Sequence, residues 1–164
     1  MLVKKISKKN RKKIAGFTLI EILLVIGIIA VLATVVIAAL DPAKRFQDAR
    51  DSRRLADIQS ISSAVAQYLI DSKGRFPAGL DSTERQIGTS VDSCEISTGG
   101  CNVTGFSDCV DLTAALAPYL KTIPLEPTNG IGQDHTHYSI VLDPNNIVTV
   151  RACDAEGGEL SISR

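Results

Sequence analysis

The sequence has few of the side chains from which catalytic sites are usually built. It contains two histidines, His135 and His137, and they stand almost next to each other. It has no glycine-rich phosphate loop of the required spacing and no serine nucleophile elbow. No cysteine has an activating partner nearby in the sequence. These absences predict that the protein is not an enzyme.

Acidic residues are missing from the first 16 positions, and this gap divides the chain by charge. Segment 1–16 carries +7, from Lys4, Lys5, Lys8, Lys9, Arg11, Lys12 and Lys13. The whole chain has 18 basic and 18 acidic side chains, so removing those seven leaves 11 basic against 18 acidic from Phe17 onward, or −7. Such an acidic remainder makes nucleic-acid binding by a basic stripe an unlikely function. The basic segment alone is typical of a solvated tail or a nucleic-acid arm. The apolar run that follows it favours a cytoplasmic membrane anchor.

Polar residues are nearly absent from Phe17 to Leu40. Three of them interrupt the run: Thr18, Glu21 and Thr34. A helix over this stretch is about 36 Å long, and the hydrocarbon core of a membrane is about 30 Å thick. We therefore expect a transmembrane helix, with 1–16 in the cytoplasm and everything after Leu40 outside. Such a start is typical of a secretory signal cut near Ala39, of an uncleaved signal anchor, or of a precursor cut before the apolar run.

The hexapeptide at the start of the apolar run favours the third of these. Gly16-Phe17-Thr18-Leu19-Ile20-Glu21, between a basic leader and an apolar stretch, resembles the prepilin cleavage motif of type IV pilins and type II secretion pseudopilins. The resemblance extends over residues 4 to about 40. It implies that a prepilin peptidase cuts between Gly16 and Phe17 and methylates the new amino group of Phe17. Gly16 is then the leader residue that the peptidase needs.

Glu21 is the residue that this resemblance explains best. A carboxylate inside a membrane helix is costly unless it is paired. After cleavage the Phe17 ammonium lies at the level of the bilayer, and Glu21 of an adjacent subunit can pair with it. We expect Glu21 to set the stagger between subunits in this way. The alternative is that Glu21 is protonated, or snorkels, near the helix start.

A second helix is expected from Ala43 to about Ser72, after the break at Asp41-Pro42. Apolar residues recur along it at three- and four-residue intervals: Leu55, Ile58, Ile61, Val65, Tyr68 and Leu69. The opposite face is charged: Arg50, Asp51, Arg53, Arg54 and Asp57. We interpret these charges as a solvated face, with subunit contacts as the alternative. Lys73-Gly74 is a helix stop signal.

The remaining chain predicts a small head of mixed structure. Segment 75–135 is expected to be a structured loop region, with a short helix over Asp111 to Leu120. Tyr138 to Leu142 and Asn146 to Arg151 form a predicted hairpin, and Glu159 to Ile162 a third short strand. The fold class is therefore α+β and pilin-like, with a long N-terminal helix packed on a small antiparallel sheet. Its parts are a leader (1–16), a transmembrane or filament-core helix (17–41), a head-packed helix (42–74) and the globular head (75–164).

Four cysteines lie in the part expected outside the membrane: Cys94, Cys101, Cys109 and Cys153. An even number in an exported domain indicates disulfides, and four cysteines allow three pairings. We expect Cys94–Cys101, which closes a Gly-Gly loop, and Cys109–Cys153, which joins the loop region to the C-terminal strands. Zinc is the rival, but the spacing is irregular and lacks a Cys-x-x-Cys pair.

No cofactor is expected, although calcium stays open. His135 and His137 lack a third ligand nearby and are interpreted as surface residues, not as metal ligands. Calcium could be held by Glu126, Asp134, Asp143 and carbonyl groups of the 123–134 loop. Some pseudopilins that this chain resembles bind calcium in a comparable loop.

The function that the resemblance implies is that of a structural filament subunit, in a type IV pilus or a type II secretion pseudopilus. The implied partners are the prepilin peptidase, other pilin subunits, an assembly ATPase and its platform protein. The implied location is the inner membrane, with the head outside, followed by an extracellular or periplasmic filament. The alternative is a single-pass, membrane-anchored binding module with an uncleaved signal anchor.

Overall fold

The computed structural model describes residues 16–104, 109–129 and 132–164. The predicted leader, apart from Gly16, therefore lies outside the described residues, as do Gly130 and Ile131 of the loop proposed to bind calcium. The chain divides into two compact units, Met1–Pro42 and Ala43–Arg164. Each unit is described separately below.

The first unit is a single apolar helix, α1, over Leu19–Leu40. Thr18 caps its N-terminus, and Asp41 follows its last residue in a left-handed conformation with φ 40°. None of its residues is buried within the chain. By length and composition α1 can cross a membrane. The predicted apolar helix is thus present, and the chain itself does not cover it.

The second unit begins with helix α2, Pro42–Asp71, within a residue of the expected range at each end. Pro42 suits a first helical turn because its missing N–H has no helical partner there. After the last turn Lys73 and Gly74 both have positive φ, 55° and 81°. The Gly74 N–H donates to the Leu69 carbonyl at 2.8 Å, and the Lys73 N–H to Ile70 at 3.2 Å. This is a Schellman ending at the stop that the sequence predicts.

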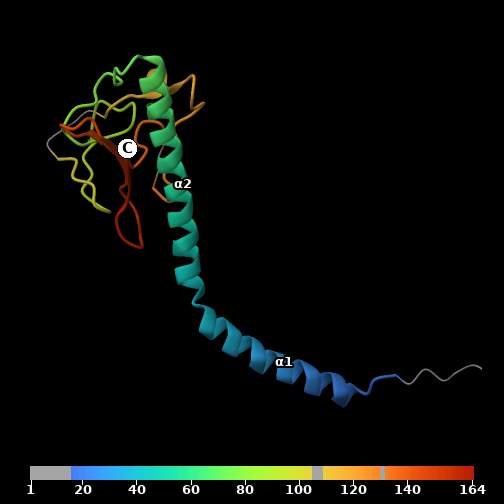
Figure 1. Cartoon of the computed structure of the whole chain (residues 1–164). Coiled ribbons are helices and arrows are strands. Elements are labelled where there is room, and N and C mark those ends of the chain that lie inside the picture. Colours follow the sequence, from blue (N-terminus) through green and yellow to red (C-terminus); the bar gives the residue numbers. More distant parts are fainter. Residues whose placement is uncertain (1–15, 105–108, 130–131) are drawn as a thin grey trace, which may run out of the picture. The chain divides into compact units, whose positions relative to one another are not determined.

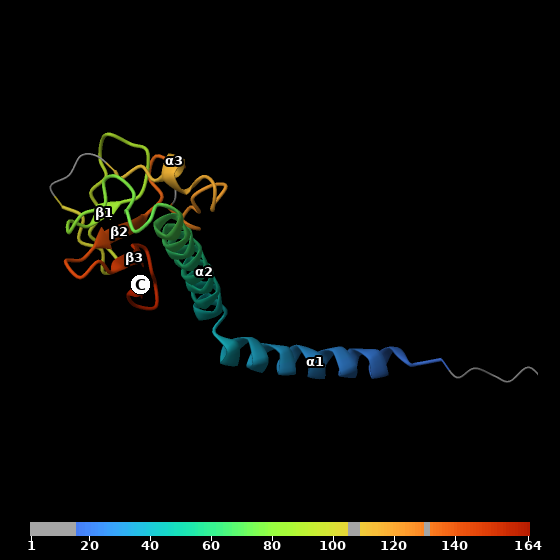
Figure 2. The same cartoon turned by 45° about the horizontal axis from the view of Figure 1, so that its top comes forward.

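A four-stranded antiparallel sheet lies beside α2 in the order β1-β2-β3-β4 (Figure 2). The strands are β1 Arg85–Gln86, β2 Tyr138–Leu142, β3 Val148–Ala152 and β4 Leu160–Ser163. In the β2–β3 hairpin Ile140 pairs with Val150, and in β3–β4 Val150 pairs with Ile162. The Asp143 carboxylate accepts the N–H groups of Asn145 and Ile147 at 2.8 Å each and so shapes the turn. The three C-terminal strands were predicted, whereas β1 was not.

The core lies between α2 and one face of the sheet, where the two run side by side in Figure 1. From α2 it takes Ile58, Ile61, Ala64 and Val65, and from β2 and β3 it takes Tyr138, Ile140, Val148, Val150 and Ala152. Each such Ile or Val contributes about 1.5–3 kcal/mol by leaving water. The predicted stripe is therefore correct in its centre, but Leu55 at its start is 39% exposed. The short helix α3 covers Thr113–Leu116, less than the expected 111–120.

All four cysteines are joined in disulfides, but the expected pairing is wrong. The bonds are Cys94–Cys109 and Cys101–Cys153. The reason lies in the loop between the first two cysteines, where Ile96 and Val103 exchange backbone hydrogen bonds at 2.9 and 3.0 Å. At its tip, Gly99 approaches Cys153 so closely that a Cβ would stand 2.4 Å from the Cys153 carbonyl oxygen. The loop therefore places Cys101 next to Cys153, and Cys94 pairs with Cys109.

Candidate functional site

The bond expected to be cleaved lies just before the first turn of α1. Phe17 is 81% exposed, and Thr18 has extended backbone angles, φ −82° and ψ 154°. No atom lies within 4 Å of where a Cβ on Gly16 would stand. Packing against the described residues therefore does not require glycine at position 16.

Glu21 has a partner within its own helix that sequence reasoning missed. The Glu21 N–H donates to the Thr18 hydroxyl oxygen at 3.3 Å, while the Thr18 N–H and hydroxyl each donate to the Glu21 carboxylate at 3.1 Å. This is a capping box, and Thr-x-x-Glu before an apolar run is its sequence signature. In the isolated subunit the carboxylate is therefore hydrogen-bonded, which lowers the cost of placing it near a membrane.

The rest of α1 presents apolar side chains on all sides. Its large apolar residues, from Leu19 to Leu40, are 49–78% exposed. Thr34 satisfies its hydroxyl internally by donating to the Val31 carbonyl at 2.7 Å. The helix thus has one charged group, Glu21, near its N-terminus and an uncovered apolar surface beyond it.

Comparison with known proteins bears on this same region. Residues 11–37 match the family described as the prokaryotic N-terminal methylation motif. The chain therefore carries, over these residues, the N-terminal signature of type IV pilins and pseudopilins, which is the motif that prepilin peptidases process. No curated protein and no solved structure matches the chain.

In the head, one predicted surface residue is buried. Arg54 of α2 was expected on a solvated face, but it is 1% exposed. Its guanidinium donates from Nε to the Glu126 carboxylate at 2.8 Å, from a second nitrogen to the same oxygen, and to the Thr128 hydroxyl at 2.7 Å. The side chain of Glu126 is fully buried. The expectation failed because helical spacing gives the direction of a side chain but not what a distant loop places over it.

Two further carboxylates complete the charged network around Arg54. Its Nη1 donates to Asp51 at 2.8 Å and to Glu156 at 2.9 Å. Arg50 adds a bidentate pair to Glu156 at 2.5 and 2.6 Å. Asp51 in turn accepts the backbone N–H groups of Glu156 and Gly157 at 3.1 and 2.7 Å. The network therefore ties α2 to the loop after Ile123 and to the loop between β3 and β4.

The network holds its acids ionised. Hydrogen bonds from Arg50 and Arg54 lower the pKa of Glu156 to about 2. Burial by itself would raise the pKa of Glu126, but hydrogen bonds from the Asn129 N–H and from Arg54 outweigh it and lower that pKa. For Asp51, burial is likewise outweighed by hydrogen bonds from the Glu156 N–H and Arg54, so its pKa is also lowered. The folded head therefore favours the charged form of each carboxylate.

The three acids expected to bind calcium have separate partners. Glu126 accepts hydrogen bonds from Arg54, Thr128 and the Asn129 N–H. Asp134 accepts the Thr89 hydroxyl at 2.7 Å, and Asp143 serves the hairpin turn. Calcium binding by this loop stays a prediction, but Glu126 would have to leave Arg54 to take part.

The two histidines line one polar hollow of about 480 Å³. His137, which has a positive φ of 61°, holds the Asp154 carboxylate at 2.8 Å through Nδ1. The Nε2 atom of His135 lies 3.1 Å from the Asp92 carbonyl oxygen. Both side chains are half-buried, so they are less exposed than expected for surface residues.

Replacing Arg54 should destabilise the head strongly. Arg54→Met leaves Glu126 buried without its cation, and breaking a buried pair in this way typically costs about 3–5 kcal/mol. The free energy of unfolding of the full chain in detergent is to be measured in urea by tyrosine fluorescence, because all three tyrosines lie in the second unit. Arg50→Met breaks a more exposed pair that water screens, so it should cost much less than Arg54→Met. Equal losses from the two variants would contradict the central role of Arg54.

Acid should weaken the head through the same carboxylates. Because their pKa values are lowered on folding, the unfolded chain binds more protons at acidic pH. Their contribution is present above the ordinary pKa of 4.5 for Glu156 and is lost as the pH falls through about 2. The urea midpoint should therefore drop across this window. Glu156→Gln should flatten part of the drop, and an unchanged pH profile in that variant would contradict the assignment.

Proposed function

We propose that the chain is a prepilin, cleaved between Gly16 and Phe17, N-methylated at Phe17 and polymerised into a type IV pilus or a type II secretion pseudopilus. The observation that carries this proposal is α1, a capped apolar helix that begins within the cleavage motif and has no buried residue among those described. Before assembly α1 lies in the inner membrane with the head outside. In the filament the same surface is covered by α1 helices of neighbouring subunits.

Transfer of α1 from the membrane into a filament needs a source of energy. It also needs an interaction that fixes the axial alignment of neighbouring subunits. Lipid tails are as apolar as leucine, so association of α1 helices gains little from the hydrophobic effect. Extraction from the membrane therefore requires an external motor, which is the role proposed for the assembly ATPase and its platform protein. Two apolar helices without a pattern of charges can also pack at many axial displacements relative to each other. A pair of opposite charges is therefore needed to favour one displacement.

Glu21 is the group that can select the stagger. The Phe17 ammonium, created by cleavage, is the matching cation on a neighbouring subunit. Each of these charges is costly in a low-dielectric filament core unless it is paired. In the free subunit the capping box with Thr18 keeps the Glu21 carboxylate at the helix start until the partner arrives. The head takes no catalytic part in this function.

Processing is tested first by intact mass and N-terminal sequencing of the chain from membranes of cells that contain a prepilin peptidase. The expected product begins at N-methylated Phe17 and lacks residues 1–16. Gly16→Val should remain uncleaved, because a branched side chain replaces the glycine that the peptidase is proposed to need. A wild-type chain that begins at Met1, or one cut near Ala39, would instead indicate a signal anchor or a secretory signal.

Assembly is tested by comparing Glu21→Ala with Thr18→Ala. Glu21→Ala should still insert and be cleaved but yield no filaments, because it leaves the Phe17 ammonium unpaired at a cost of about 3–5 kcal/mol. Thr18→Ala removes the cap, worth about 1 kcal/mol, but keeps the carboxylate, so it should still form filaments. The yield of sheared filaments, relative to total subunit in the membrane, is the measurement. Normal yield from Glu21→Ala, or equal loss from both variants, would refute intersubunit pairing.

A further inference from the structure

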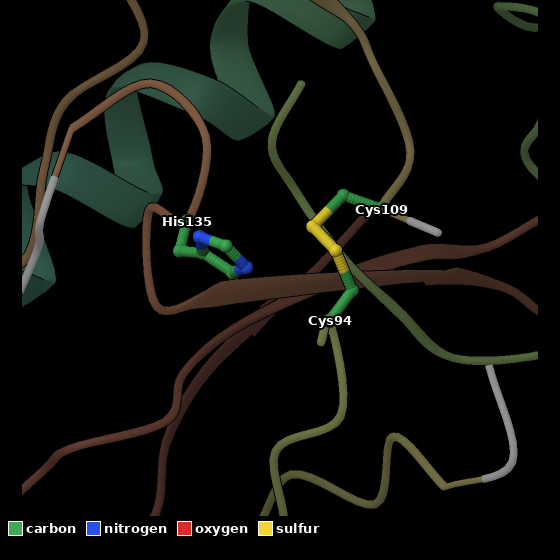
Figure 3. Close-up of side chains that lie close together, drawn as sticks. All are labelled: Cys94, Cys109 and His135. Atoms are coloured by element: carbon green, nitrogen blue, oxygen red, sulfur yellow. A yellow bond between two sulfur atoms is a disulfide. The ribbon is translucent and has the colours of Figure 1, made fainter. Parts of the chain in front are cut away.

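The two disulfides of the head lie in different surroundings. Cys101 and Cys153 are 5% and 0% exposed, and the Cys101 sulfur lies 3.1 Å from the Ser139 hydroxyl oxygen. The other disulfide joins buried Cys94 to half-buried Cys109. In Figure 3 the imidazole of His135 lies beside that second disulfide.

These three side chains bring metal-binding atoms together. The sulfurs of Cys94 and Cys109 and a ring nitrogen of His135 all lie within 4.8 Å of one another. Within the described parts of the chain, no other group of three His, Cys, Asp or Glu side chains converges in this way. Two thiolates and one imidazole form a ligand set that zinc prefers in proteins.

The backbone holds these positions together independently of the sulfur–sulfur bond. The Cys109 N–H donates to the Ser90 carbonyl at 3.0 Å, which fixes Cys109 against the segment that leads to Cys94. The Ser90 N–H donates to the Asp134 carbonyl at 3.3 Å, which places that same segment beside His135. All three ligands are thus anchored around Ser90.

Gly88 allows the backbone at Asp134 and the sulfur of Cys109 to approach each other closely. A Cβ at this position would stand 2.1 Å from the Asp134 carbonyl oxygen and 3.1 Å from the Cys109 sulfur. The His135 ring is further fixed by the Asp92 carbonyl oxygen, 3.1 Å from Nε2. Loss of the disulfide therefore leaves the two sulfurs and the imidazole as neighbours.

We propose that Cys94, Cys109 and His135 form a binding site for a thiophilic divalent metal such as Zn²⁺ when the two cysteines are reduced. A dithiol reductant supplies two electrons and two protons to the disulfide and itself becomes a cyclic disulfide. The metal then displaces the two thiol protons. A disulfide oxidant accepts two electrons from the thiolates, takes up two protons from solvent and becomes two thiols. The Cys94–Cys109 bond forms again and the metal is released, so disulfide and metal are alternative states of one site. His135 also lines the hollow of about 480 Å³, and we expect a water molecule from this hollow to supply the fourth ligand.

The test uses the full chain in detergent, reduced with dithiothreitol that is then removed without access of air, and Co²⁺ as a spectroscopic probe that Zn²⁺ then displaces. The reduced chain should bind one metal per chain with a thiolate-to-cobalt charge-transfer band, whereas the oxidised chain should show no such band. His135→Ala should weaken binding at least about 10-fold. His137→Ala, which alters the other histidine of the same hollow, is the matched control and should leave the affinity unchanged.

Alkylation of the reduced wild-type chain identifies the cysteines without any variant that might fail to fold. Bound Zn²⁺ should protect Cys94 and Cys109 from iodoacetamide and leave Cys101 and Cys153 no better protected than without metal, as read by peptide mass spectrometry. Three results would overturn the proposal: no metal bound to the reduced chain, affinity unchanged in His135→Ala, or protection that centres on Cys101 and Cys153.

Discussion

The buried guanidinium of Arg54 is the interaction on which the head's architecture depends. It contacts Asp51 on its own helix, Glu126 in the loop after Ile123 and Glu156 in the loop between β3 and β4, which no other cation in the described part of the chain does. The apolar core fixes α2 against the sheet but gives these loops no unique position, since hydrophobic contact is not directional. The charged network around Arg54 fixes the positions of these loops, because hydrogen bonds and ion pairs are directional. Because the Glu126 side chain is fully buried, loss of Arg54 leaves its carboxylate as a buried charge without its cation.

The cost of a charge without a counter-charge in a low-dielectric environment also applies to Glu21 in α1, but with a different outcome. Arg54 finds its counter-charges inside the fold, whereas among the described residues the donors to the Glu21 carboxylate are the N–H and the hydroxyl of Thr18. A capping box satisfies the carboxylate's lone pairs but does not neutralise its charge. Within the described residues the first unit therefore keeps an unneutralised anion on an otherwise apolar helix. The charge of Arg54 is thus neutralised within the head, whereas Glu21 is suited to a cation from outside the chain.

Much of the fold could be predicted because its signals are local. The helix over Pro42–Asp71 follows from apolar spacing and the Lys73-Gly74 stop, and the β2–β3 hairpin from two β-rich runs around Asp143. The prepilin motif is local as well. The disulfide pairing and the burial of Arg54 could not be predicted, because they depend on contacts between segments 52 and 72 residues apart. Strand β1 is two residues long, too short for any periodicity. The capping box was readable from Thr18 and Glu21 but was overlooked because the carboxylate was considered only as a charge.

Magnitudes decide whether Glu21 can both cap its helix and set the register of a filament. Loss of a helix N-cap typically costs about 1 kcal/mol, and release of the Glu21 carboxylate leaves the Thr18 hydroxyl bound to the Glu21 N–H, so we expect it to cost no more than that. An ammonium left unpaired in a dry interface costs about 3–5 kcal/mol. Exchange of the cap for the Phe17 ammonium of a neighbour is therefore favourable once that neighbour is in register, and unfavourable at any other stagger. The capping box keeps the Glu21 carboxylate at the helix start, where the Phe17 ammonium of the neighbour must bind it. Its hydrogen bonds are weak enough for that ammonium to replace them.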